Sequence, residues 1–167
     1  MRHQEGRRAV ASAYIETTVP SYYWETRRTP QIVAWREATR QWWRLFRHGY
    51  ELYTSRFVLA ELARAPSPKA RRALRLMSGV RLLGEPPGLA EVVEYYVQHR
   101  LMPVEAGGDA VHLALASMHG MDFLLTWNCR HLANANKVRH LTIINRRLGL
   151  HVPVVTTPLT LIPEQQA

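Results

Sequence analysis

The chain has 167 residues, 47% of them hydrophobic, which is enough for one domain with a hydrophobic core. Its formal net charge of +9 and its pI near 10.4 favour a polyanionic partner, either nucleic acid or an anionic membrane surface. A basic surface without such a partner is the alternative. The single cysteine, Cys129, excludes an internal disulfide framework and a thiolate zinc site. No apolar run approaches the roughly 20 residues of a membrane span, so we expect a cytoplasmic protein with no membrane segment.

Short apolar segments with the pattern of strands alternate with helical patterns along the chain. The expected strands are residues 9–15, 51–54, 80–83, 123–125 and 152–156. This alternation predicts an α/β protein with a parallel sheet in one domain. We expect a basic leader over residues 1–8, the domain over 9–157 and a tail over 158–167.

The longest helix is expected to begin with Thr29 as its cap and Pro30 as its first residue, and to end at Gly49. Apolar residues recur along it at three- and four-residue steps, which predicts a buried stripe. The stripe consists of Ile32, Trp35, Thr39, Trp42 and Phe46. Later helices are expected after the cap Ser55, over residues 69–77, after Gly88 and over residues 133–148. In the last of these the apolar face is expected to be Val138, Leu141, Ile144 and Leu148.

Three acidic residues stand in unusual surroundings. Glu16 follows the first strand, Glu61 lies inside an apolar helix, and Asp109 stands at the start of another apolar helix. A carboxylate inside an apolar run costs on the order of several kcal/mol unless something pairs with it. Arg64, three residues after Glu61, is one candidate for a purely structural partner.

Polar residues also follow the expected strand 123–125, where Thr126 and Asn128 stand. In open α/β sheets the chemistry gathers outside the carboxyl ends of the strands, so these residues are expected at that edge and Asp122 at the opposite one. Three acids brought together there repel one another unless a cation lies between them. Oxygen ligands of this kind suit Mg²⁺ or Mn²⁺, which can activate a water for attack on a phosphodiester.

Four segments follow one another in chain order: YIETTVPSY, TSxxVLxEL, DAVHLAxA and FLLTWNCRHLANA. Together they resemble the four motifs of PIN-domain nucleases, and most of all those of the VapC-like toxins of toxin–antitoxin pairs. The resemblance runs over residues 9–157. It implies a PIN-like three-layer α/β sandwich, with a central parallel sheet flanked by helices, and Mg²⁺- or Mn²⁺-dependent endoribonuclease activity. It also implies RNA as the substrate, a small antitoxin protein as a partner, and a homodimer.

The resemblance assigns a role to single residues. Glu16 stands where the family has its first acid, usually Asp, and Glu61 and Asp109 match the second and third acids. These three are then the metal ligands. Asn128 stands where many members have a fourth acid, and Thr126 occupies the hydroxyl position before it; both would orient water or the metal's shell. Because Asn128 brings no charge, we predict a weak, Mn²⁺-favouring site with slow RNA cleavage.

A basic stripe on the long helix is the expected RNA contact. The stripe consists of Arg36, Arg40, Arg44 and Arg47, with Trp43 alongside. Its first three arginines, together with Arg130 after the polar edge, are the expected RNA-binding residues. Lys and Arg charges supply most nonspecific affinity for nucleic acids, and aromatic rings can stack on bases. A plain solvated face is the alternative for this stripe.

The remaining observations leave competing hypotheses open. His112 and His119 lie seven residues apart on one helix and are expected to be a structural or surface pair. We predict that the carboxyl groups of Glu16, Glu61 and Asp109 converge, with Asn128 at the rim. The competing hypotheses are a PIN-like module that binds nucleic acid or protein without cutting, and a basic α/β domain whose three acids lie far apart.

Overall fold

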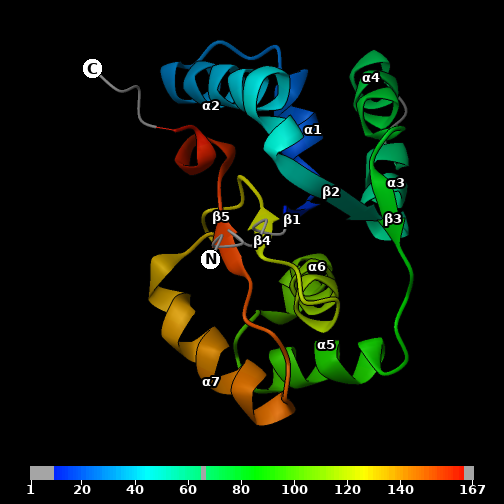
Figure 1. Cartoon of the computed structure of the whole chain (residues 1–167), viewed down its shortest axis with the longest axis vertical. Helices are drawn as coiled ribbons and strands as arrows, with labels where there is room; N and C mark the ends of the chain where they lie inside the picture. The colour runs from blue at the N-terminus through cyan, green and yellow to red at the C-terminus, as the bar shows by residue number, and fades with distance from the viewer. Residues whose placement is uncertain (1–9, 65–66, 164–167) are drawn as a thin grey trace, which may run out of the picture.

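The computed structural model describes residues 10–64 and 67–163, so the expected leader (1–8) and the end of the expected tail (164–167) lie outside the described residues. Its centre is a five-stranded parallel sheet with the order β3-β2-β1-β4-β5 (Figure 1). The strands are β1 (Ala11–Ile15), β2 (Tyr50–Ser55), β3 (Arg81–Leu83), β4 (Phe123–Leu125) and β5 (Val154–Thr156). Every expected strand is present, with small differences at its ends.

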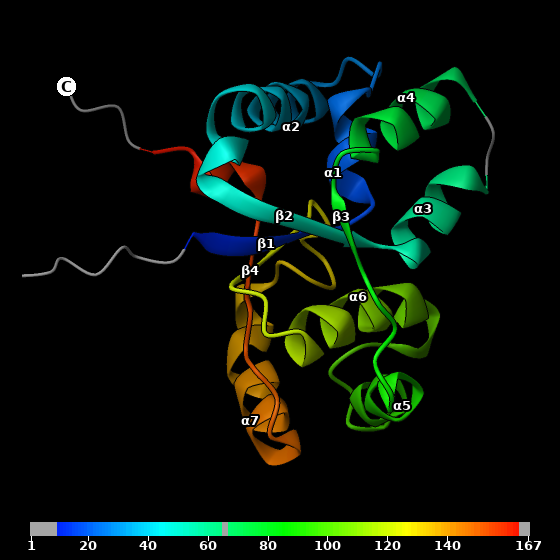
Figure 2. The same ribbon diagram turned by 45° about the vertical axis from the view of Figure 1, so that its right-hand side comes forward.

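Helices cover both faces of the sheet. On one side lie α1 (Thr18–Tyr23), α2 (Pro30–Gln41), α3 (Arg56–Ala63) and α4 (Pro68–Met77). On the other lie α5 (Leu89–Gln98), α6 (Gly107–Met118) and α7 (Val138–Leu148), as Figures 1 and 2 show. The predicted fold class, a single-domain three-layer α/β sandwich with a central parallel sheet, is confirmed. None of the helices in the described part of the chain has the length and apolar character that crossing a bilayer requires.

Short helical turns complete the chain. They are the π-helical turn η1 (Trp42–Phe46) and the 3₁₀ turns η2 (Arg47–Gly49), η3 (Val104–Ala106), η4 (Ala135–Lys137) and η5 (Pro158–Leu161). The long helix predicted to run to Gly49 is therefore α2 followed by η1 and η2. The first residues of the expected tail form η5, in which Pro158 is buried.

The sheet is most deeply buried at its centre, as expected for parallel strands covered on both faces. Tyr14 and Ile15 of β1 and Leu124 and Leu125 of β4 are fully buried. Ile15 pairs with Leu125 in the β1–β4 register, so the two strands end level with each other. The residues that follow them, the candidate site residues Glu16 and Thr126, therefore emerge side by side.

Side-chain capping occurs at one of the two expected places, Ser55, and also at Ser67, which was not predicted as a cap. The Ser55 and Ser67 hydroxyls accept hydrogen bonds from the backbone N–H groups of Val58 (3.5 Å) and Ala70 (3.0 Å), respectively. Thr29 precedes Pro30 with an extended backbone, but its side chain makes no capping hydrogen bond.

Two predicted apolar faces need correction. Thr39 and Trp42 are fully buried, as expected, but Trp43 is also buried, with only 4% of its surface exposed. Trp43, in the π-helical turn η1, is therefore not an exposed ring, although the guanidinium carbon of Arg47 lies 5.6 Å from its centre. Val138, predicted on the inner face of the last long helix, is 56% exposed, since it lies at the helix start beyond the buried Leu141.

Candidate functional site

Glu16 leaves the end of β1 as a buried carboxylate, with only 3% of its surface exposed. Its Oε2 accepts hydrogen bonds from the Thr18 N–H (3.0 Å), the Thr126 hydroxyl (2.8 Å) and the Thr18 hydroxyl. Burial raises the pKa of Glu16 in spite of these donors and the nearby His112. Among the described residues no donor reaches its Oε1, so one oxygen is anchored and the other is free to ligate.

Glu61 enters the same space from α3. Its carboxylate accepts a hydrogen bond from the Thr17 hydroxyl, and both of its oxygens lie 3.2 Å from Nε2 of His112. Burial alone would raise the pKa of Glu61, but His112 and Thr17 hold it below its ordinary value. Arg64, the expected structural partner, is exposed and forms no ion pair with Glu61 within the described residues. The expected direct pairing is therefore absent, although the positive charge of Arg64 also helps to lower the pKa of Glu61.

His112 of α6 is the site residue that the sequence analysis missed. Its side chain is 1% exposed, with Nε2 on Glu61 and Nδ1 2.8 Å from the Tyr14 hydroxyl. The Tyr14 hydroxyl in turn lies 2.7 Å from the Ser55 hydroxyl. Burial alone would lower the pKa of His112, but the surrounding carboxylates raise it above its ordinary value.

The expected pairing of His112 with His119 is wrong, since His119 bonds the carbonyl oxygen of Gly84 through Nε2 (2.9 Å). One signal in the sequence indicated the true position. His112 stands three residues after Asp109, and residues three apart share one face of a helix. A residue on the face of a proposed ligand was therefore a candidate for the same site.

Asp109 lies to the side of this group. One oxygen of Glu16, one of Glu61 and a ring nitrogen of His112 all lie within 4.8 Å of one another, and Asp109 does not belong to that group. Asp109 is half-buried, which raises its pKa although His131, His112 and Asn128 act against the shift. Two of the three predicted acids therefore converge, and the third flanks them.

Asn128 holds Asp109 in place. Its Nδ2 donates to Oδ2 of Asp109 (2.9 Å), and its Oδ1 accepts from the backbone N–H of His131 (3.1 Å). Its own N–H donates to the Thr126 hydroxyl (2.9 Å), which also donates to Glu16. Both polar atoms of the amide are thus engaged within the protein. Asn128 was expected to orient water or the metal's shell, but it holds Asp109 instead, and Thr126 links it to Glu16.

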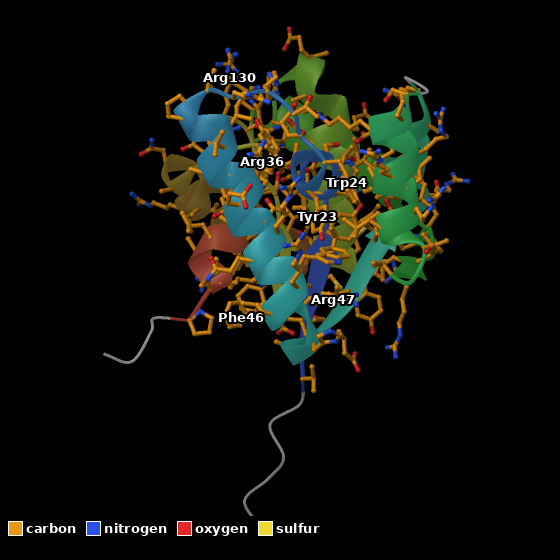
Figure 3. The ribbon with its side chains drawn as sticks, turned by 90° about the horizontal axis from the view of Figure 1, so that it is seen from above. Tyr23, Trp24, Arg36, Phe46, Arg47 and Arg130 are labelled. Carbon is orange, nitrogen blue, oxygen red and sulfur yellow. The ribbon has the colours of Figure 1, made fainter. Side chains whose placement is uncertain are left out.

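The predicted RNA-binding arginines of α2 and η1 have intramolecular partners. Arg36 donates to Oε1 of Glu37 (2.9 Å), and Arg40 donates to the carbonyl oxygen of Tyr23 (2.9 Å). Arg44 donates to the Tyr23 hydroxyl (3.3 Å). Figure 3 looks onto this face of the molecule, with Tyr23 between α2 and α4. The bonds of Arg40 and Arg44 to Tyr23 join α1 to α2 and η1, while Arg44 is also exposed, as is the fourth arginine, Arg130.

The fold and the site together define a basic, parallel α/β protein with a mixed carboxylate–imidazole cluster at the carboxyl edge of its sheet. Comparison of the chain with protein-family models, curated proteins and solved structures finds no match. The resemblance to PIN-domain nucleases therefore stays a prediction from the four motifs. The geometry alone shows two carboxylates and one imidazole close enough to share a divalent cation.

Proposed function

We propose that this protein is a metal-dependent endoribonuclease of the PIN type, acting as the toxin of a VapC-like toxin–antitoxin pair. The observation that carries the proposal is the convergence of Glu16 and Glu61 beside His112 at the carboxyl edge of the sheet. The order of the four motifs supports the same assignment. Its substrate is RNA, and its setting is cytoplasmic. A small antitoxin protein and a second copy of the chain are its proposed partners.

The residues present fit a divalent cation. Glu16 offers Oε1, which no described donor occupies, and Glu61 offers a carboxylate within 4.8 Å. Two negative charges this close favour a cation between them. Oxygen ligands suit Mg²⁺ or Mn²⁺, and the His112 imidazole, bonded to Glu61 through Nε2 and to Tyr14 through Nδ1, holds one of the two carboxylates that would bind the ion. When bound, such a cation lowers the pKa of a water and stabilises charge on a phosphodiester.

The surrounding side chains hold the carboxylates in position. Thr18 and Thr126 donate to Oε2 of Glu16, and no donor among the described residues occupies its Oε1. Glu61 accepts hydrogen bonds from His112, which lies on α6, and from Thr17, which follows β1. Asn128 holds Asp109 at the flank, where its carboxylate can accept a hydrogen bond from water at the site. Catalysis of this kind depends on such preorganised groups.

The test is calorimetric Mn²⁺ titration with a parallel assay of RNA cleavage. Glu16→Gln keeps the shape of the side chain but removes its charge, so it should abolish Mn²⁺ binding and cleavage together. The matched control is Asp122→Asn, which removes a charge at the opposite edge of the sheet, where Asp122 accepts hydrogen bonds from Ser12. Loss of cleavage in both variants, or unchanged Mn²⁺ binding in Glu16→Gln, would contradict the proposal.

A second candidate function is a PIN-like module that binds nucleic acid or protein without cutting it. Asn128 favours this alternative, because it occupies the fourth acid position and its amide is fully engaged within the protein. The cluster then has fewer charges for a cation. Binding of RNA with no cleavage at any Mn²⁺ concentration would support the module over the nuclease.

A further inference from the structure

The face of α4 turned away from the core is entirely basic. The helix contains no acidic residue, and its cations are Lys69, Arg71, Arg72 and Arg75. The three arginines are exposed, whereas Ala73 and Met77 on the opposite side of the helix are buried. Positions 71, 72 and 75 lie on one helical face, so the three guanidinium groups form a single surface. We call it the α4 arginine face.

The α4 arginine face differs from the predicted stripe on α2 in its lack of partners. Within the described residues, Arg71, Arg72 and Arg75 form no hydrogen bond or ion pair through their side chains, whereas Arg36 and Arg40 bond Glu37 and the α1 backbone. The guanidinium carbon of Arg72 lies 5.5 Å from the centre of the Trp24 ring, a contact that leaves its N–H groups free. Figure 3 shows Trp24 on this side of the molecule.

A hollow connects this helix to the carboxylate cluster. A pocket of about 180 Å³ lies between α1, α3 and α4, and Glu61 lines it. Its other lining residues are Thr17, Ser21, Leu62, Ser67, Lys69, Ala70 and Ala73. Lys69 lies on the flank of α4 between this pocket and Arg72, and its Nζ bonds the buried Glu25 (2.6 Å). Residues of α4 therefore form one wall of the pocket that Glu61 lines.

We propose that the α4 arginine face holds the phosphate backbone of single-stranded RNA and directs it into the pocket beside Glu61. The inference rests on the proposed function and moves the RNA contact from α2 to α4. Free guanidinium groups match phosphate oxygens in charge and geometry, often with two hydrogen bonds at once. A single strand also has the flexibility to enter a pocket of this size, which a duplex lacks.

The molecule offers a matched control on its opposite layer. Helix α7 also contains no acidic residue and has three exposed arginines: Arg139, Arg146 and Arg147. Figure 1 places α7 on the other side of the sheet from α4. Replacing three arginines by glutamine on either helix changes the net charge equally. Only position relative to the site differs between the two variants.

The experiment measures binding of a fluorescent oligouridylate by anisotropy across a salt series, in EDTA so that no cleavage occurs. The Arg71→Gln, Arg72→Gln, Arg75→Gln variant should flatten the slope of log K against log salt by about 2 units, since each lost single-strand phosphate contact removes about 0.7. The α7 triple variant should keep the wild-type slope. A triple Arg→Lys variant on α4 should keep most of the slope, because it retains the charge.

Three results would overturn the proposal. They are an equal loss of slope in the α4 and α7 variants, no change in the α4 variant, and displacement of the RNA by polyglutamate of equal length at equal concentration. The last would identify an acidic polypeptide as the occupant. Circular dichroism of the α4 Arg→Gln variant separates misfolding from lost contacts. Binding is measured without metal, so it is independent of cleavage. A salt slope that depends on the α4 arginines, together with no cleavage in Mn²⁺, would refute the proposed nuclease activity and support RNA binding by the α4 arginine face.

Discussion

Replacing Asn128 by Asp tests the most informative contact in the site. Asn128→Asp changes the donor Nδ2, which lies 2.9 Å from Oδ2 of Asp109, into a second carboxylate oxygen. The Oδ1 atom keeps its partner, because it accepts from the His131 N–H. The variant therefore loses the hydrogen bond to the Asp109 carboxylate and places a second negative charge in contact with it. Both effects destabilise the protein when no cation is present.

The magnitude follows from the geometry. A hydrogen bond to a charged group contributes about 1.5–3 kcal/mol, and two charges about 4 Å apart repel by about 4 kcal/mol at an effective dielectric constant of 20. Uptake of a proton by the pair limits the repulsion, so a loss of about 3 kcal/mol in unfolding free energy is expected near neutral pH. At about 2–4 °C per kcal/mol for a chain of this size, the Tm in EDTA should fall by about 6–12 °C.

Divalent cations should reverse part of this loss. A cation near the new carboxylate pair relieves the repulsion, so Mn²⁺ should bind Asn128→Asp more tightly than wild type. A tenfold gain in affinity adds about 1.4 kcal/mol to the stabilisation at saturating Mn²⁺ and raises the Tm by about 3–5 °C more than in wild type. RNA cleavage should be faster. Asp109→Asn should slow cleavage but keep part of the Mn²⁺ response, because Asp109 flanks the ligand group and does not belong to it.

The assay is thermal unfolding in EDTA and over a Mn²⁺ series. The matched control is Asn136→Asp, which adds the same charge at an exposed position in η4. It should melt with wild type in both conditions. If Asn128→Asp had the same Tm as wild type in EDTA, the Asn128–Asp109 contact would be refuted. A lower Tm in EDTA without a larger Mn²⁺ response would show that the amide position lies outside the reach of the metal.

Three further predictions address other contacts. Gly108→Ala should weaken Mn²⁺ binding, because the new Cβ would lie 3.0 Å from Oε1 of Glu61, whereas Gly107→Ala meets nothing within 4 Å and should leave calorimetric affinity unchanged. Arg27 and Lys69 hold the pKa of Glu25 well below its usual range. The stabilisation by the Glu25 carboxylate is therefore present above pH of about 4 and is lost as the pH falls further. Glu25→Gln should flatten the acid limb of a plot of Tm against pH. Ser67→Ala should cost about 1 kcal/mol in urea unfolding by removing the α4 cap, and an unchanged midpoint would contradict that role.

The sequence alone determined the order of the strands and helices along the chain and the edge of the sheet at which the candidate site lies. Those features depend on local patterns, since buried parallel strands read as short apolar runs and helices repeat at three to four residues. Glu16 and Thr126 each directly follow such a run. Once β1 and β4 pair in register, the two residues must meet, and the structure shows their hydrogen bond of 2.8 Å.

Only the tertiary structure decided which side chains share the site and what each one contacts. Glu61 meets His112 across 51 positions of chain, and the packing of α3 against α6 selects this partner over Arg64, which is nearer in sequence. The amide of Asn128 faces Asp109 because the loop after β4 turns back over the start of α6. Local periodicity reports which face of a helix is buried but not what lies opposite that face. The arginines show the same limit, because both helices contain arginines and only the structure shows that Arg40 of α2 bonds the α1 backbone while Arg71, Arg72 and Arg75 of α4 are exposed.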